Sequence, residues 1–62
     1  MVNIKEVRRN ANLTLEKMAE MVGVSVSTLI RWEKGKTSPT LKHLPKIAEV
    51  LGITIEELLK DD

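Results

Sequence analysis

The feature of this 62-residue sequence that most constrains its fold is the regular placement of residues that end helices. Gly23, Gly35 and Gly52 each directly follow a segment whose apolar residues recur at helical spacing. Glycine at such a position adopts the left-handed conformation that commonly closes a helix. Asn12 tolerates the same conformation after the first segment. We therefore expect a series of short helices.

Residues that favour helix starts precede the same segments. Asn3, Thr14, Ser25 and Thr54 each lie just before a periodic run, where a side-chain oxygen accepts a hydrogen bond from a free backbone amide of the first turn. Pro45 is favourable at a first helical position but not in a helix interior, so residues 36–43 are expected to form a loop. The sequence predicts five helices, at residues 4–11, 15–22, 26–34, 45–51 and 55–60, and no strand.

The expected fold is therefore all-α, a compact bundle of five helices in a single domain at residues 1–62. None of the helices reaches the roughly 12 to 15 residues needed for marginal stability on its own, so each depends on packing against the others. The expected core residues are Ile4, Val7, Leu13, Met18, Ala19, Val22, Val24, Leu29, Trp32, Leu44, Ile47, Ala48, Leu51, Ile53 and Leu58. His43, the single histidine, is expected to be a solvated loop side chain.

Composition argues against catalysis. The sequence contains no cysteine, which excludes disulfides, thiolate nucleophiles and cysteine-ligated zinc. A domain of this size buries only about 60% of its unfolded surface, and a deep substrate pocket would hollow out its core. We expect no enzyme activity, no cofactor, no metal and no small-molecule ligand. Because no apolar run exceeds two residues, we also expect no membrane span and a cytoplasmic location.

Charge is distributed unevenly along the chain. Residues 1–48 carry nine Lys or Arg residues against four acids, a net charge of +5, whereas residues 49–62 carry a net charge of −4. One end therefore suits a polyanion and the other does not. Trp32 is the only aromatic residue, so the stacking surfaces that bind single-stranded nucleic acids cannot form. A nucleic-acid partner is expected to be a duplex.

The stretch from Leu15 to Lys34 carries most of the functional information. Two helix-period segments are joined by a short step at Gly23, and Ala19 is small where the second helix must pass closely over the first. Helices joined by such a turn cross at roughly 90 to 120° and leave the start of the second helix projecting outward. This is the geometry of a helix-turn-helix.

Three runs of residues, Leu13–Ser25, Ser27–Leu29 and Trp32–Pro39, resemble the phage repressor and Cro-type (XRE-like) helix-turn-helix family. The likeness extends from about Ile4 to Leu59. It implies a transcriptional regulator, repressor-like, whose third helix enters the major groove of double-stranded DNA. It also implies a protein that is nucleoid-associated when bound to DNA and that usually binds as a dimer.

The resemblance places the family's base-reading positions on Val26, Ser27 and Arg31. Arg31 offers a bidentate fork for guanine, Val26 suits a thymine methyl group, and Ser27 donates or accepts a hydrogen bond without discrimination. A phosphate contact is the alternative role for Arg31. The positions that resemble the family's contacts to the DNA backbone are Thr14, Lys34, Lys36 and Thr37, to which Lys42 is added for its charge and location. Arg8 and Glu33 stand where the family often has a structural ion pair.

One departure from the family leaves a second reading open. The family commonly has glutamine where this sequence has Leu15, and Leu15, Val26 and Ile30 would together form an apolar group on or near the outward face. That group suits either thymine methyl groups or a protein partner. The alternative function is therefore a protein-interaction module, antitoxin-like or anti-repressor, that uses this face.

A second apolar group lies near the acidic end. Val50, Ile55 and Leu59 exceed what so small a core readily absorbs. They suggest a homodimer contact, although a monomer that tucks them inside is the alternative.

Overall fold

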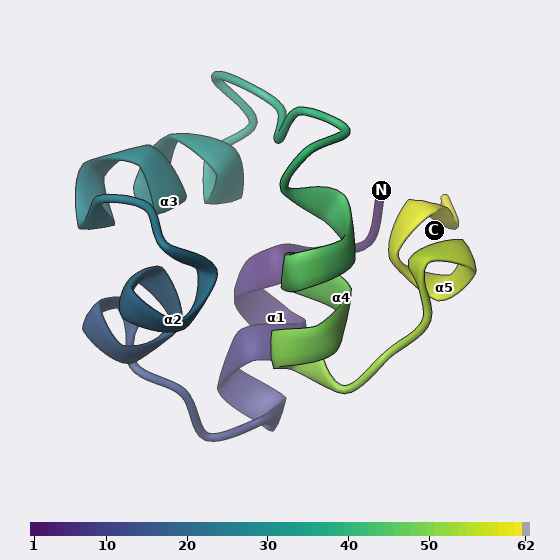
Figure 1. Cartoon of the computed structure of the whole chain (residues 1–62), viewed down its shortest axis with the longest axis horizontal. Helices are drawn as coiled ribbons and strands as arrows, with labels where there is room; N and C mark the ends of the chain where they lie inside the picture. The colour runs from purple at the N-terminus through teal and green to yellow at the C-terminus, as the bar shows by residue number, and fades with distance from the viewer. Residues whose placement is uncertain (62) are drawn as a thin grey trace.

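The computed structural model describes residues 1–61, and the regular structure within them is entirely helical. The helices are α1 (Ile4–Asn10), α2 (Leu15–Val22), α3 (Val26–Glu33), α4 (Leu44–Leu51) and α5 (Ile55–Leu59), shown in Figure 1. Every boundary lies within one residue of the position expected from the sequence. The five-helix, all-α fold is confirmed. None of these described helices is long and apolar enough to cross a membrane.

Side-chain caps explain why the boundaries lie where they do. Thr14 begins α2, and its hydroxyl accepts a hydrogen bond from the backbone amide of Lys17 at 3.0 Å. Thr54 and Glu57 form a reciprocal capping box at the start of α5, with both hydrogen bonds at 3.0 Å. Asn12 has a φ of 60°, the left-handed conformation expected after α1. Side chains thus cap the starts of α1, α2, α3 and α5, whereas α4 has no side-chain cap and carries a proline in its first turn.

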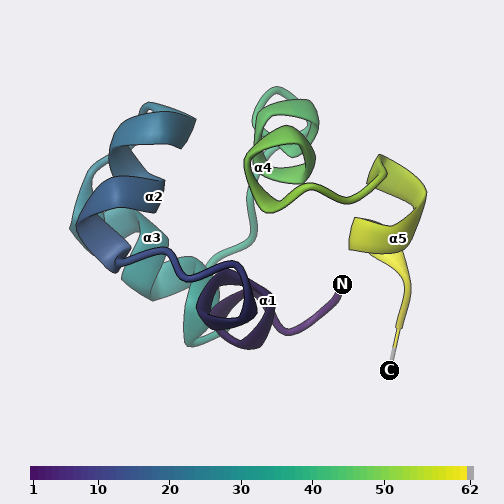
Figure 2. The same cartoon turned by 90° about the horizontal axis from the view of Figure 1, so that it is seen from below.

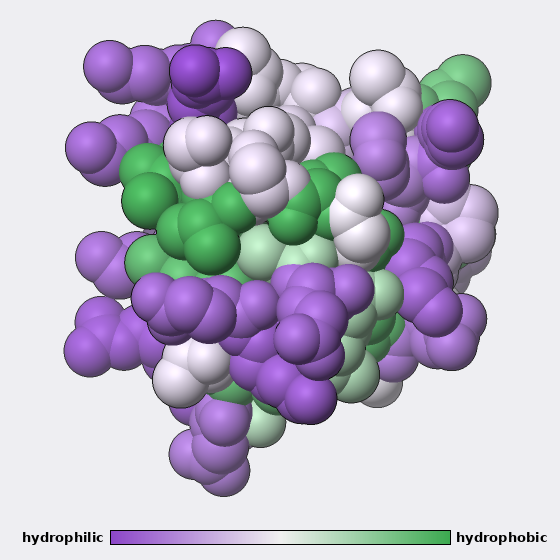
Figure 3. All heavy atoms as spheres, turned by 60° about the vertical axis from the view of Figure 1, so that its left-hand side comes forward, coloured by the Kyte–Doolittle hydropathy of each residue, from purple (hydrophilic) through white to green (hydrophobic). Residues whose placement is uncertain are grey.

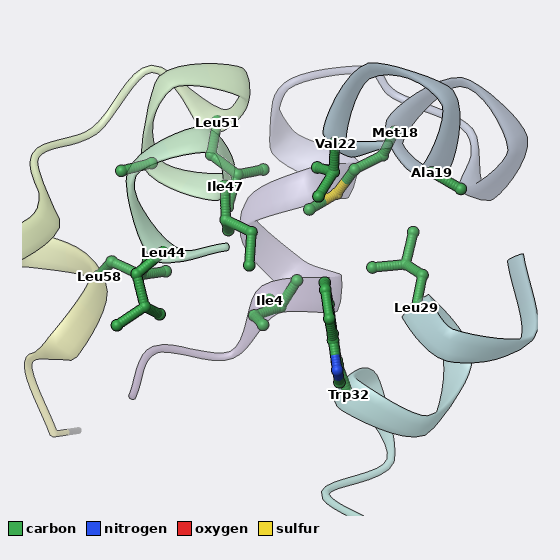
Figure 4. Packing of buried hydrophobic residues seen from close by; sticks show 11 residues of the cluster. Ile4, Met18, Ala19, Val22, Leu29, Trp32, Leu44, Ile47, Leu51 and Leu58 are labelled. Atoms are coloured by element: carbon green, nitrogen blue, oxygen red, sulfur yellow. The ribbon is translucent and has the colours of Figure 1, made fainter. Parts of the chain in front are cut away.

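The helices surround one apolar core. The α2 helix packs against both α3 and α4, while α1 contacts α3 and α5 contacts α4. Figures 1 and 2 both place α2 and α3 at one end of the molecule and α5 at the other. Side chains from all five helices meet between them (Figure 4): Ile4, Met18, Ala19, Val22, Leu29, Trp32, Leu44, Ile47, Ala48, Leu51 and Leu58. These eleven residues were all expected in the core.

Four other expected core residues are not fully buried. Val7, Leu13, Val24 and Ile53 are half-buried and pack against the edge of the core. In a domain this small most of the volume lies close to the surface, so an apolar side chain at a helix edge or in a turn keeps part of its area in water. These four expected core residues therefore lie at the edge of the core rather than in its buried centre.

His43 also differs from the expectation of a solvated loop side chain. It is half-buried at the start of α4, and its ring centroid lies 5.4 Å from that of Trp32 with the planes tilted by 56°. Its Nδ1 atom is 3.0 Å from the hydroxyl oxygen of Thr40. The turn before α4 therefore closes over the buried indole and brings the imidazole against it.

Candidate nucleic-acid interface

The turn between α2 and α3 is closed by backbone hydrogen bonds. The amides of Gly23 and Val24 both donate to the carbonyl of Ala19, at 2.8 and 3.0 Å. Gly23 has a φ of 88°, which a residue with a side chain rarely adopts. The hydroxyl of Ser25 then accepts from the amide of Thr28 at 3.2 Å and begins α3. The start of α3 is therefore held in one orientation relative to α2.

Of the three residues expected to read bases, Ser27 and Arg31 are four residues apart on α3 and share a face, while Val26 is the first residue of the helix. Ser27 and Arg31 are exposed and Val26 is half-buried. The guanidinium of Arg31 takes part in no ion pair within residues 1–61, so it is available to an external ligand. The Ser27 hydroxyl lies 3.2 Å from that of Ser25. The Ser27 hydroxyl therefore already has a hydrogen-bonding partner within the chain, whereas the Arg31 guanidinium has no ion-pair partner within residues 1–61.

The residues expected to contact the DNA backbone are all exposed: Thr14, Lys34, Lys36, Thr37 and Lys42. Lys34 caps the end of α3, and the amide of Lys36 donates to the carbonyl of Arg31 at 3.0 Å, which folds the following loop back onto that end. Across the described chain, Lys34, Lys36 and Lys42 take part in no ion pair. Their charges are thus uncompensated by nearby carboxylates.

Arg8 and Glu33 form the expected ion pair, and it is buried. The Nε atom of Arg8 donates to Oε2 of Glu33 at 2.7 Å, and Nη2 donates to Oε1 at 3.4 Å. The remaining Nη1 donates to the carbonyl of Leu13 at 2.7 Å. The two side chains are 9% and 7% exposed. Arg8 therefore ties α1, the loop before α2 and the end of α3 into one unit.

The apolar residues Leu15, Val26 and Ile30, here called the apolar triad, are half-buried rather than fully outward-facing. Leu15 and Val26 pack against the core, while Leu15 and Ile30 line a surface hollow of about 330 Å³. Figure 3 shows an apolar area bordered by hydrophilic residues on the side of α2 and α3. The rest of the hollow is lined by charged residues: Lys5, Arg8, Glu33 and Lys34.

Sequence reasoning missed Lys5 as part of this surface. Lys5 lies in the first turn of α1, and it reaches the hollow because α1 packs against α3. The only local signal is its place one turn before Arg8 on the same helix face. Which face of α1 meets α3 is set by long-range packing, which the local pattern does not contain.

The second apolar group lies apart from this surface. Val50 is half-buried, whereas Ile55 and Leu59 are 42% and 49% exposed. They belong to α4 and α5, and α5 lies at the end of the molecule away from α2 and α3 (Figure 2). A monomer therefore does not tuck Ile55 and Leu59 inside.

Comparison with known proteins agrees with this geometry. Residues 4–58 match the family model described as helix-turn-helix. An uncharacterized HTH-type transcriptional regulator of Archaeoglobus fulgidus is 46% identical over 55 residues, which are 89% of this chain and 78% of that protein. The cryptic phage CTXphi transcriptional repressor RstR of Vibrio cholerae is 36% identical over 58 residues, and the match spans 94% of this chain but about half (52%) of the repressor.

A solved structure extends the comparison to a DNA complex. The crystal structure of SinR, described as the master regulator for biofilm formation, in complex with DNA aligns with a TM-score of 0.83 at 33% identity. The alignment covers 92% of each chain. These matches confirm the resemblance read from the sequence, and the chain belongs to the helix-turn-helix family of DNA-binding transcriptional regulators.

Proposed function

We propose that this chain regulates transcription by binding double-stranded DNA sequence-specifically, with the start of α3 in the major groove. The observation that carries the proposal is the pair of exposed side chains Ser27 and Arg31 on a helix held rigidly by the turn at Gly23 and by the buried Arg8–Glu33 pair. The major groove of B-DNA admits an α-helix, and its base edges distinguish all four base pairs.

Arg31 supplies most of the discrimination between bases in this proposal. Its guanidinium, which takes part in no ion pair within residues 1–61, can donate two parallel hydrogen bonds to O6 and N7 of guanine, a contact worth about 1 to 3 kcal/mol against the wrong base. Val26 adds an apolar contact and Ser27 a weak, unselective one. A phosphate contact by Arg31 is the competing role, and it would give affinity without sequence preference.

The backbone contacts set the position of the domain on the duplex. The lysines at the end of α3 and in the following loop act as point charges for phosphates, and the free amides at the start of α2 beside Thr14 suit the same anions. The α3 helix, which carries Arg31, lies at the end of the molecule opposite the acidic α5 helix (Figure 2). This separation orients the molecule before contact, since the acidic end is repelled by the duplex.

We further propose that Val50, Ile55 and Leu59 form a homodimer contact. Two copies joined at this surface would leave both α3 helices free for DNA, because the surface lies away from α2 and α3. The partly exposed Ile55 and Leu59 support the proposal, since joining two copies removes their apolar area from water. Sedimentation of the protein and of an Ile55→Asp, Leu59→Asp variant tests the proposed contact. The parent is expected to sediment as a dimer and the variant as a monomer.

The salt dependence of DNA binding tests the proposed function. Three lysines that each neutralise one phosphate predict a slope of log Kd against log salt of about 0.9 per contact, or nearly 3 for each bound copy. A protein-interaction module that used the apolar triad would bind its partner with little response to salt. Failure to bind any duplex at low salt, in a titration with labelled DNA, contradicts the proposal.

A further inference from the structure

The surface hollow of about 330 Å³ lies where α1 and the first turn of α2 meet the second half of α3. Leu15 and Ile30 supply its apolar lining, and both side chains are half-buried. Small-molecule sites typically have volumes of about 300 to 1,000 Å³, with apolar walls and a few polar groups. Because this hollow lies on the surface between helices, a ligand there displaces no core side chain.

The charged residues around the hollow are cationic in sum. Lys5, Arg8 and Lys34 carry three positive charges against the one carboxylate of Glu33, a net charge of +2. That carboxylate is 7% exposed and lies 2.7 Å from the Nε atom of Arg8. Within residues 1–61, Lys5 and Lys34 take part in no ion pair, and both are exposed. The two ammonium groups are therefore the charges that a ligand in the hollow meets.

This combination of apolar lining and free cations selects one class of ligand. An apolar group placed against Leu15 and Ile30 leaves water, which is favourable. A carboxylate beside an ammonium group gains a charge-assisted hydrogen bond. Both lysines repel a cationic ligand, and a fully polar anion leaves the apolar lining uncovered. The complementary ligand therefore has an apolar body and one anionic end.

We infer that the hollow binds a small amphipathic carboxylate, an alkyl or aryl acid, with its apolar body against Leu15 and Ile30 and its carboxylate beside the two lysines. The ligand is also an effector that releases DNA, a step that rests on the proposed function. Lys34 is a proposed phosphate contact, and Leu15 directly follows Thr14, which is another. A ligand in the hollow therefore occupies the place of the DNA backbone.

A titration of the isotope-labelled protein with straight-chain acids, followed by NMR, tests the site without DNA. Hexanoate, octanoate and decanoate, each below its micelle concentration, should bind with affinity that rises by up to about fourfold for each added methylene. The amide signals that shift should belong to α1, the start of α2 and the end of α3. Octylammonium, a cation with the same alkyl chain as octylamine, should show no saturable binding, and binding equal to that of octanoate would overturn the inference.

Two variants test the two parts of the site separately. Leu15→Gln removes half of the apolar lining at a half-buried position and should weaken octanoate binding by about fourfold or more. Lys5→Gln should weaken octanoate binding by about two- to fivefold and leave binding of neutral octanol unchanged. Lys60→Gln is the matched control, because it removes the same charge from an exposed lysine at the end of α5, away from α2 and α3 (Figure 2). Octanoate affinity that is equal in all three variants and the parent would overturn the site.

Competition with a labelled duplex at constant ionic strength tests the effector role. Octanoate should raise the apparent Kd of the parent for the duplex, whereas octylammonium should not. Lys5→Gln, at a residue that the proposed function does not use, should bind the duplex as the parent does but need about two- to fivefold more octanoate for release.

The outcomes distinguish failure of the inference from failure of the proposed function. If no acid binds, or if octanoate binds while the duplex stays bound, the site or its effector role is overturned and the proposed function stands. A protein that binds octanoate in the hollow but binds no duplex refutes the proposed function and the effector role, and leaves the site standing.

Discussion

Replacing Arg8 with alanine is expected to destabilise the domain severely. Arg8 donates to Glu33 at 2.7 and 3.4 Å and to the carbonyl of Leu13 at 2.7 Å, so the change leaves a carboxylate only 7% exposed and a carbonyl oxygen without their donors. Removing one partner of a buried pair costs about 3 to 5 kcal/mol. A domain of this length has a total stability of roughly 3 to 9 kcal/mol. The variant should therefore lose between about a third and all of its stability.

Thermal unfolding at neutral pH, followed by circular dichroism, measures the effect. Each 1 kcal/mol shifts the melting temperature of so small a domain by about 4 to 8 °C, so Arg8→Ala should melt at least about 12 °C below the parent. Arg9→Ala is the control, because Arg9 is the neighbouring exposed arginine and surface substitutions usually change stability by less than about 0.5 kcal/mol. Equal melting temperatures for the two variants would refute the reasoning.

A double replacement separates the ion pair from simple loss of packing. Arg8→Met with Glu33→Leu removes both charges and keeps most of the apolar volume. Exchanging a buried pair for apolar residues of similar size is often neutral or stabilising. The double variant should therefore be more stable than Arg8→Ala alone. A double variant as unstable as Arg8→Ala would show that the unpaired Glu33 carboxylate is not the cause of the lost stability.

Three further results are expected. Lys36→Ala should weaken binding to every duplex alike and reduce the salt slope by about 0.9, and an unchanged slope would remove Lys36 from the phosphate contacts. The backbone amide of Thr54, followed by the Thr54 hydroxyl, lowers the pKa of Glu57 below 4.5, so this carboxylate stabilises the fold above pH 4.5 and the contribution is lost as pH falls through the lowered pKa. Urea unfolding of Glu57→Gln should consequently show a shallower loss of stability in acid than the parent. Gly23→Ala should cost about 1 to 2 kcal/mol from the left-handed backbone alone, since among the described residues no atom outside Gly23 and its two chain neighbours lies within 4 Å of the added carbon, and a fully stable variant would contradict this.

The helices could be predicted closely because their signals are local. Capping side chains and left-handed residues act within three or four positions of each boundary, as at Thr14 and Gly23. The largest core side chains could also be predicted, since their spacing along each helix marks the inward face. Burial at the edges of the core could not be predicted, because whether Val24 or Ile53 is covered depends on how neighbouring elements approach.

The site could be predicted in part. Arg8 and Glu33 are separated by 25 residues, and only the family resemblance brought them together before the structure was known. The same resemblance proposed the contact residues on α3 and its loop. The hollow between Leu15 and Ile30, and the place of Lys5 beside it, depend on the crossing of α1 over α3. That crossing is a property of the packed core as a whole.

Selection of preferred duplexes for the parent and for Arg31→Ala tests the central claim most directly. The claim is that the exposed face of α3 reads base edges in the major groove. It predicts that the parent selects a defined site and that Arg31→Ala loses preference at one base pair for each bound copy, while the preferences at other positions remain. A variant that weakens binding to all sequences equally and selects the same site as the parent would contradict it.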